Sequence, residues 1–125
     1  MKVAHTMLRV SDPEKVIVFY RDAFGFELRR KSENDTFTLY FLTIPGQEID
    51  LELTYNHGED DRYEKGEGFG HIAIHTPEDT SLSEAYKQAV QAGGEDYRPP
   101  EECPGNYAFV KDPEGYEVEI LASSS

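Results

Sequence analysis

The two halves of the chain repeat the same order of sequence patterns, and this repeat limits the possible folds more than any other feature. The first half opens on a strand-like stretch, VAHTMLRV, followed by the turn SDPE and a helical pattern over about 13–24. The second half opens on GHIAIHT, followed by PEDT and a helical pattern over about 81–92. Three strand-like stretches follow each helix. Such a repeat predicts two βαβββ modules and therefore an α+β fold.

Recognisable signals mark the ends of the predicted helices. Asp12 precedes Pro13, which is typical of an N-terminal cap with proline in the first turn. Gly25 follows the first helical pattern, and the pair Gly93–Gly94 follows the second. Near the end of the chain, the strand-like stretches YAFVKD and YEVEILA flank a DPEG turn, which predicts a hairpin.

Length and charge bound the class of protein. A length of 125 residues suits one domain (1–125), with module 1 at about 1–57 and module 2 at about 68–123. The 25 acidic residues against 12 basic ones give a net charge of −13, which argues against nucleic acid or an anionic membrane as partner. No apolar run is long enough for a membrane span or signal peptide, so we expect a cytoplasmic protein. Cys103 is the only cysteine and is expected to be an ordinary loop residue.

Alternation along the strands separates an apolar face from a polar one. In IDLELTYN, residues 49–56, Glu52 lies on the face opposite Leu51 and Leu53. His5 shares a face of the first strand with Arg9. In YEVEI, near the end of the chain, Glu119 lies opposite the apolar residues.

Superimposing the halves pairs His5 with His71, at an offset of 66, and Glu52 with Glu119, at an offset of 67. Each half thus supplies a histidine from its first strand and a glutamate from its last. Two carboxylates brought together repel each other unless a cation lies between them. Two imidazoles and two carboxylates would neutralise and ligate a divalent ion, and this donor set leaves zinc, nickel, cobalt, manganese and iron open. A closed tetrahedral site would be structural, whereas an octahedral ion with two open positions would be catalytic.

Four motifs carry a resemblance to a known family. They are HTMLRV at 5–10, ELTYN at 52–56, GHIAI at 70–74 and DPEGYEVEI at 112–120. Together they resemble bacterial glyoxalase I (lactoylglutathione lyase) in its short form, a member of the vicinal-oxygen-chelate superfamily. The resemblance covers almost the whole chain. It implies two βαβββ modules whose sheets curve around a metal-binding cavity.

The resemblance also implies roles for particular residues. The positions that match the metal ligands of the family are His5, Glu52, His71 and Glu119. Arg9 and Asn56 match the positions that hold the γ-glutamyl end of glutathione. The family builds its site at a homodimer interface, with each chain supplying one histidine–glutamate pair, although this sequence alone leaves open whether the site forms within one chain or across two. The short form implies Ni²⁺ or Co²⁺, with Zn²⁺ also compatible.

The implied activity is a metal-dependent isomerisation. The hemithioacetal of methylglyoxal and a thiol becomes a lactoyl thioester through an enediolate chelated to the metal, with Glu119 as the base and Glu52 as its symmetry mate. The family often has a lysine near the glycine carboxylate of the thiol, whereas here the loop RPPEECPGNY is short and acidic and lacks this cation. The thiol is therefore expected to be glutathione or another low-molecular-weight thiol, such as one without the glycyl carboxylate. His57 and His75 are expected not to be ligands.

Two alternatives stay open at this point. One keeps the fold and the metal but changes the chemistry, to an epimerase or a thiol transferase. The other is a metal-free protein of the same fold that binds a small molecule.

Overall fold

The structure is a computed structural model that describes residues 1–123. The elements of the first module are β1 (His5–Arg9), α1 (Pro13–Phe24), β2 (Glu27–Glu33), β3 (Phe37–Thr43) and β4 (Asp50–Asn56). The elements of the second module are β5 (His71–His75), α2 (Leu82–Gln91), β6 (Glu95–Arg98), the 3₁₀ turn η1 (Pro100–Glu102), β7 (Tyr107–Lys111) and β8 (Glu117–Leu121). The predicted element order is therefore confirmed, with η1 as the one addition.

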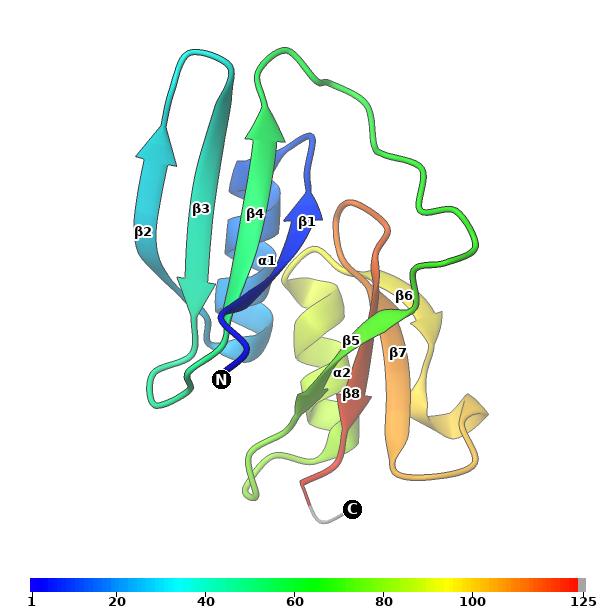
Figure 1. The fold of residues 1–125 in the computed structure, drawn as a ribbon. Helices are drawn as coiled ribbons and strands as arrows, with labels where there is room; N and C mark the ends of the chain where they lie inside the picture. Colours follow the sequence, from blue (N-terminus) through cyan, green and yellow to red (C-terminus); the bar gives the residue numbers. More distant parts are fainter. Residues whose placement is uncertain (124–125) are drawn as a thin grey trace.

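Each module forms a four-stranded sheet of the same topology. The strand orders are β1-β4-β3-β2 and β5-β8-β7-β6. The first strand of each module runs parallel to the last, and the other neighbours are antiparallel. Figure 1 shows α1 behind the first sheet and α2 behind the second. The fold is the predicted α+β arrangement of two βαβββ modules.

Local signals explain where both helices begin and end. The Asp12 side chain accepts a hydrogen bond from the backbone N–H of Lys15 at 3.3 Å, and Gly25 adopts the left-handed conformation at φ 81° after α1. At the start of α2, Ser81 and Glu84 form a reciprocal capping box. These caps place the helix boundaries within a residue of those predicted.

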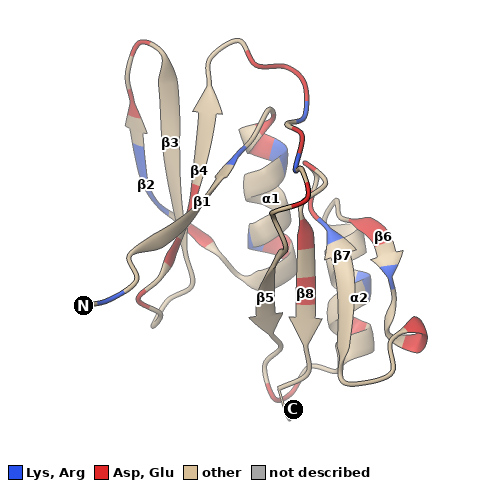
Figure 2. Cartoon of the chain, turned by 45° about the vertical axis from the view of Figure 1, so that its right-hand side comes forward, with Lys and Arg blue, Asp and Glu red and all other residues tan. Residues whose placement is uncertain are grey.

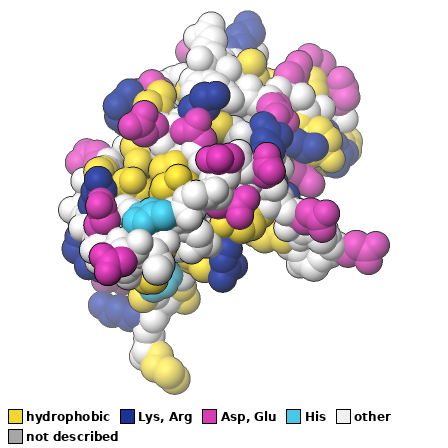
Figure 3. Space-filling model, turned by 90° about the horizontal axis from the view of Figure 1, so that it is seen from above, with side chains coloured by type: hydrophobic (Ala, Val, Ile, Leu, Met, Phe, Trp, Pro, Cys, Tyr) yellow, Lys and Arg dark blue, Asp and Glu magenta, His cyan; other side chains and the backbone are white. Residues whose placement is uncertain are grey.

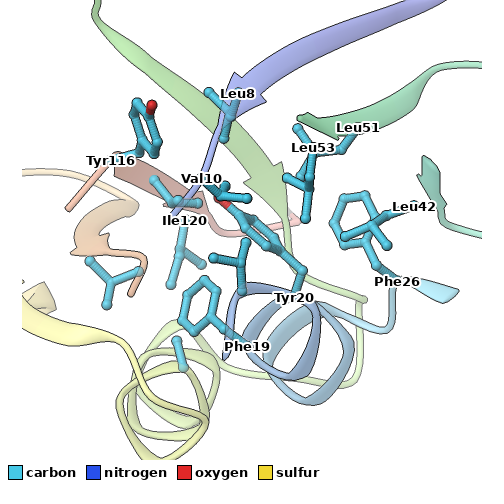
Figure 4. Packing of buried hydrophobic residues seen from close by; sticks show 14 of the residues in the cluster. Leu8, Val10, Phe19, Tyr20, Phe26, Leu42, Leu51, Leu53, Tyr116 and Ile120 are labelled. Atoms are coloured by element: carbon cyan, nitrogen blue, oxygen red, sulfur yellow. The ribbon is translucent and has the colours of Figure 1, made fainter. Parts of the chain in front are cut away.

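The core lies between the two helices and the inner faces of the two sheets. Phe19 and Tyr20 of α1 are fully buried and point into the centre, where Val10 of the first module approaches Ile120 of the second (Figure 4). The helices α1 and α2 also pack against each other. A Cβ added at Gly94 would lie 2.8 Å from Phe19, so this close packing requires glycine. The two modules therefore share one core.

A polar turn between β7 and β8 joins the second module to the first. Glu114 is 2% exposed, and its carboxylate accepts hydrogen bonds from the Ser11 hydroxyl at 2.9 Å and the Asp12 backbone N–H at 2.9 Å. The Tyr116 hydroxyl donates to the backbone carbonyl of Arg9 at 2.7 Å. Hydrogen bonds to a buried carboxylate are among the stronger ones in proteins. This turn thus attaches to the end of β1 and the start of α1.

Asp112 holds the same turn in shape from inside. Its side chain is completely buried and accepts hydrogen bonds from the backbone N–H groups of Glu114 (2.9 Å) and Tyr116 (3.0 Å) and from the Tyr20 hydroxyl (2.8 Å). Burial raises the pKa of Asp112 to about 6, against the opposing effect of these hydrogen bonds.

The connector between the modules also docks on this turn. Arg62 donates to the carbonyl of Pro113 at 2.7 Å and pairs with Glu95 at 2.7 Å. Lys65 donates to the carbonyls of Tyr63 and Glu114. The acidic connector therefore uses its two cations to fasten itself to the second module.

Charged side chains are distributed over most of the surface. Figure 2 shows acidic residues along the connector, in β8 and in the turns, and Figure 3 shows acidic and basic side chains interspersed on one face. None of the helices between residues 1 and 123 is both long enough and apolar enough to cross a membrane. The cytoplasmic location and the exclusion of nucleic acid stay predictions.

The buried Asp112 predicts a specific pH dependence of stability. Its pKa rises from 3.8 to about 6 on folding, so the unfolded chain loses this proton first, and the contribution of Asp112 to stability falls as pH rises from about 4 through 6. The shift corresponds to about 3 kcal/mol. Asp112→Asn cannot ionise, so relative to the wild type it should gain about this much between pH 4 and pH 7. Urea unfolding of both proteins at several pH values and one protein concentration checks this, and parallel stability curves would contradict it.

Candidate functional site

The first histidine–glutamate pair lies on the outer face of the first sheet. Strand β1 runs parallel to β4 and aligns Met7 with Glu52, which brings the His5 ring beside the Glu52 carboxylate. The His5 Nε2 atom is 2.8 Å from Glu52 Oε1. Glu52 is 8% exposed, whereas His5 is exposed. The neighbours of Glu52, Leu51 and Leu53, are in the core, so the Glu52 side chain lies on the opposite face of the sheet, in agreement with the prediction from strand alternation.

The second module repeats this pair. Strand β5 runs parallel to β8 and aligns Ala73 with Glu119. The His71 Nε2 atom is 3.2 Å from Glu119 Oε1, and His71 is exposed. Both pairs thus present one imidazole nitrogen and one carboxylate oxygen, which suit Zn²⁺, Ni²⁺ or Co²⁺.

An aromatic ring supports each histidine. Phe41 is paired with Glu52 across β3 and β4, and its ring meets the His5 ring edge to face at 6.1 Å. Phe109 is paired with Glu119 across β7 and β8, and its ring meets the His71 ring at 5.1 Å. These contacts limit how each imidazole can turn.

The two pairs do not come together within this chain. They lie on separate sheets, and residues 1–123 contain no group of three or more histidine, cysteine, aspartate or glutamate side chains placed to hold one metal ion. The expectation of two sheets curving around one metal cavity is therefore not met by a single copy. The physical reason is the docking of the modules through their helices and the β7–β8 turn, which leaves each outer sheet face without the other opposite it.

The two predicted substrate contacts lie at the far end of the first sheet. Arg9 ends β1 on the same face as His5, and Asn56 ends β4 on the same face as Glu52. The Asn56 Nδ2 group donates to the Tyr63 hydroxyl at 3.0 Å, which orients the amide and leaves its oxygen free for a donor. Tyr63 was not singled out from the sequence, because no periodic pattern covers the connector.

Three further residues have local roles. His57 Nε2 is 2.8 Å from the Thr38 hydroxyl, and His57 Nδ1 is 3.2 Å from the carbonyl of Asp35, so this ring braces the end of the sheet. His75 ends β5, exposed, on the face that carries His71. Cys103 is buried beside the carbonyl of Arg98.

The loop in which the family lysine is missing begins with another cation, Arg98. Arg98 ends β6, in the stretch predicted as a strand, and its guanidinium carbon is 5.6 Å from the centre of the Phe109 ring. The contact between Arg98 and Phe109 could not be predicted from the sequence, because the short strand β6 has exposed side chains throughout and no alternation to reveal its face.

Known proteins of similar sequence identify the family of the chain. Residues 2–120 match the model of the glyoxalase/bleomycin resistance protein/dioxygenase superfamily. The chain belongs to this superfamily. Lactoylglutathione lyase of Haemophilus influenzae is 40% identical, over 100% of this chain and 95% of that protein. Probable lactoylglutathione lyase of Vibrio cholerae is 42% identical, over 96% of this chain and 89% of that protein.

A solved structure agrees with these relatives. The trypanothione-dependent glyoxalase I of Leishmania major superimposes with a TM-score of 0.83 at 35% identity, covering 99% of this chain and 88% of that one. The resemblance to glyoxalase I expected from the four motifs is thereby confirmed, as is the fold class.

Proposed function

We propose that this protein is a glyoxalase I that isomerises the hemithioacetal of a 2-oxoaldehyde, methylglyoxal, and a low-molecular-weight thiol to a 2-hydroxyacyl thioester. The observation that carries this proposal is the repeated histidine–glutamate pair on the outer face of each sheet. The similarity of the whole chain to lactoylglutathione lyases supports the same chemistry.

The complete site would form between two copies of the chain. One copy supplies His5 and Glu52, and the other supplies His71 and Glu119. A symmetric dimer with this interface contains two equivalent sites. Each pair is tolerable alone because imidazole and carboxylate sit side by side, whereas two carboxylates facing each other require a cation between them.

The four donors fit a divalent metal ion. Neutral imidazole nitrogen and carboxylate oxygen are ligands of Ni²⁺, Co²⁺ and Zn²⁺, and two carboxylates balance the charge. We favour Ni²⁺ or Co²⁺. The ion would supply Lewis-acid stabilisation of the negative charge that develops on two neighbouring oxygens of the substrate.

The remaining chemistry belongs to side chains of the protein. Glu119 would remove the proton from C1 of the hemithioacetal and return a proton to C2, and Glu52 is its symmetry mate for the other enantiomer. Arg9 would hold a carboxylate of the thiol by a forked pair of hydrogen bonds, and Asn56 would accept from a neighbouring N–H. The thiol is glutathione or a related compound.

The alternatives have less support. An epimerase or thiol transferase would use the same metal donors, but the full-length relatives described above are lactoylglutathione lyases. A metal-free binding protein has no need of two matched pairs of metal-ligating side chains.

A complementation experiment tests the two-copy site. His5→Ala and His71→Ala should each be inactive as homodimers, since each breaks both sites. Mixing them by unfolding and refolding together should restore about a quarter of wild-type activity, because half of the dimers are mixed and each mixed dimer has one intact site. His5→Ala mixed with Glu52→Ala is the matched control. Both substitutions fall in the same half of the site, so each site of the mixed dimer contains one of them and no activity should return. If His5→Ala and His71→Ala give no activity on mixing while mixed dimers form, the site does not span two chains.

A metal experiment tests the reaction itself. Metal-stripped protein should regain thioester formation from methylglyoxal and a thiol when Ni²⁺ or Co²⁺ is added, measured with glutathione and other cellular thiols. Glu119→Gln keeps an oxygen ligand but removes the base, so kcat should fall by at least about 100-fold while the protein still binds metal. Failure of every metal and thiol combination would end the proposed function, and loss of folding in Glu119→Gln would indicate a structural metal instead.

A further inference from the structure

The same histidine–aromatic–arginine arrangement occurs in both modules, beyond the pairs already described. In the first module the guanidinium carbon of Arg30 lies 4.2 Å from the centre of the Phe41 ring, which contacts His5. In the second, Arg98 lies over Phe109, which contacts His71. Phe109 follows Phe41, and Arg98 follows Arg30, by 68 positions, close to the offsets of the histidines and glutamates.

The strand registers place Arg30 in the same row of the sheet as Glu52. Arg30 is paired with Phe41 across β2 and β3, and Phe41 is paired with Glu52 across β3 and β4. Neighbouring strands are about 4.8 Å apart, so the backbone of Arg30 lies about 10 Å from that of Glu52. Because the Arg30 guanidinium folds back over Phe41, it is closer to the Glu52 carboxylate than the Arg30 backbone is, by about the spacing between two strands.

Arg30 has no carboxylate partner among residues 1–123, although acidic groups lie near it. It lines an open hollow of about 460 Å³ together with His5, Arg29, Glu48 and Asp50. Asp50 accepts from Arg29 Nε at 3.0 Å, and Glu48 is paired with Lys2 at 3.1 Å. Both acidic groups are therefore paired with other cations, and Arg30 has no ion-pair partner among residues 1–123.

This geometry suits an anion. A guanidinium that lies over an aromatic ring keeps its in-plane N–H groups free, and a carboxylate binds to two of them at once. We propose that Arg30 forms a second carboxylate subsite, which favours hemithioacetals carrying a carboxylate in addition to the one held by Arg9. This proposal rests on the proposed function. The second carboxylate belongs either to the thiol or to the substituent of the 2-oxoaldehyde.

Steady-state kinetics on chosen hemithioacetals tests the subsite. The reference is methylglyoxal with glutathione esterified at its glycine, which keeps only the γ-glutamyl carboxylate. One arm restores the thiol carboxylate by using glutathione itself. The other arm keeps the ester and replaces methylglyoxal with 4,5-dioxopentanoate, a 2-oxoaldehyde that bears a carboxylate on its substituent.

The expected result is a change in a ratio. The ratio is kcat/KM for the substrate of one arm divided by kcat/KM for the reference substrate. In at least one arm this ratio should be about tenfold lower in Arg30→Gln than in the wild type, because a charge-assisted hydrogen bond is lost. The arm that falls identifies the source of the carboxylate. Lys31→Gln is the matched control: it removes the same charge from the next residue, whose side chain lies over Tyr40 and pairs with Glu33, and it should leave both ratios unchanged.

The outcomes separate this proposal from the one on which it rests. Unchanged ratios in Arg30→Gln, or an equal fall in Lys31→Gln, overturn the subsite while leaving the isomerase intact. Absence of turnover by the wild type of every hemithioacetal tested, with glutathione itself and other cellular thiols included, overturns the isomerase and the subsite together. If Arg30→Gln does not fold, Arg30→Lys provides the test, because it keeps the charge without the fork and should lower the same ratio by a smaller factor.

Discussion

The buried turn between β7 and β8 is the constraint on which the arrangement of the molecule depends. It inserts the carboxylate of Glu114 beside Ser11 and the start of α1, and its Tyr116 hydroxyl binds the last carbonyl of β1. With Asp112 against Tyr20, these contacts fix the second module on the helical side of the first. The outer face of each sheet, where the histidine–glutamate pairs lie, is consequently left open.

Because the outer sheet faces are open, electrostatics explains why the proposed metal site would require two copies of the chain. Among residues 1–123, the cationic or imidazole partner of each glutamate is one histidine, at 2.8 Å for Glu52 and 3.2 Å for Glu119. Bringing two such pairs face to face places two carboxylates together, and only a cation makes that favourable. Metal binding and pairing of two chains would then be linked, because a ligand bound only by the assembled form stabilises that form.

The sequence predicts the local structure and each half of the site better than their assembly. Alternation in IDLELTYN places Glu52 on the outer face, and the offset between the halves identifies its partner Glu119, since both signals depend only on residue spacing. The position of one module on the other depends instead on Glu114, an acidic residue in a turn. Acidic residues in turns are usually exposed, so its burial was not foreseeable from residue type.

The stacking of Arg30 on Phe41 and of Arg98 on Phe109 could not be predicted from the sequence, for a different reason. Both follow an irregularity in the strand register, between Leu28 and Arg30 in β2 and between Asp96 and Arg98 in β6. A register shift of this kind changes which face a side chain occupies, so alternation along the strand fails there. The offset of 68 is the one sequence signal that would have paired these arginines.

The two modules carry the same residues near the proposed metal but different residues farther from it. This difference makes the two ends of the proposed site unequal. Histidine, glutamate, phenylalanine and arginine recur in both modules, whereas the counterparts of Arg9 and Asn56 at the same offsets as the ligands are His75 and Ser123. A symmetric set of donors would hold an ion equally from both sides. A guanidinium and an amide at only one end would hold the thiol one way round, so the two glutamates would face different atoms of the substrate. On the proposed function, the near-symmetry of the modules provides the metal site, and its breakdown at Arg9 and Asn56 decides which carboxylate acts as the base.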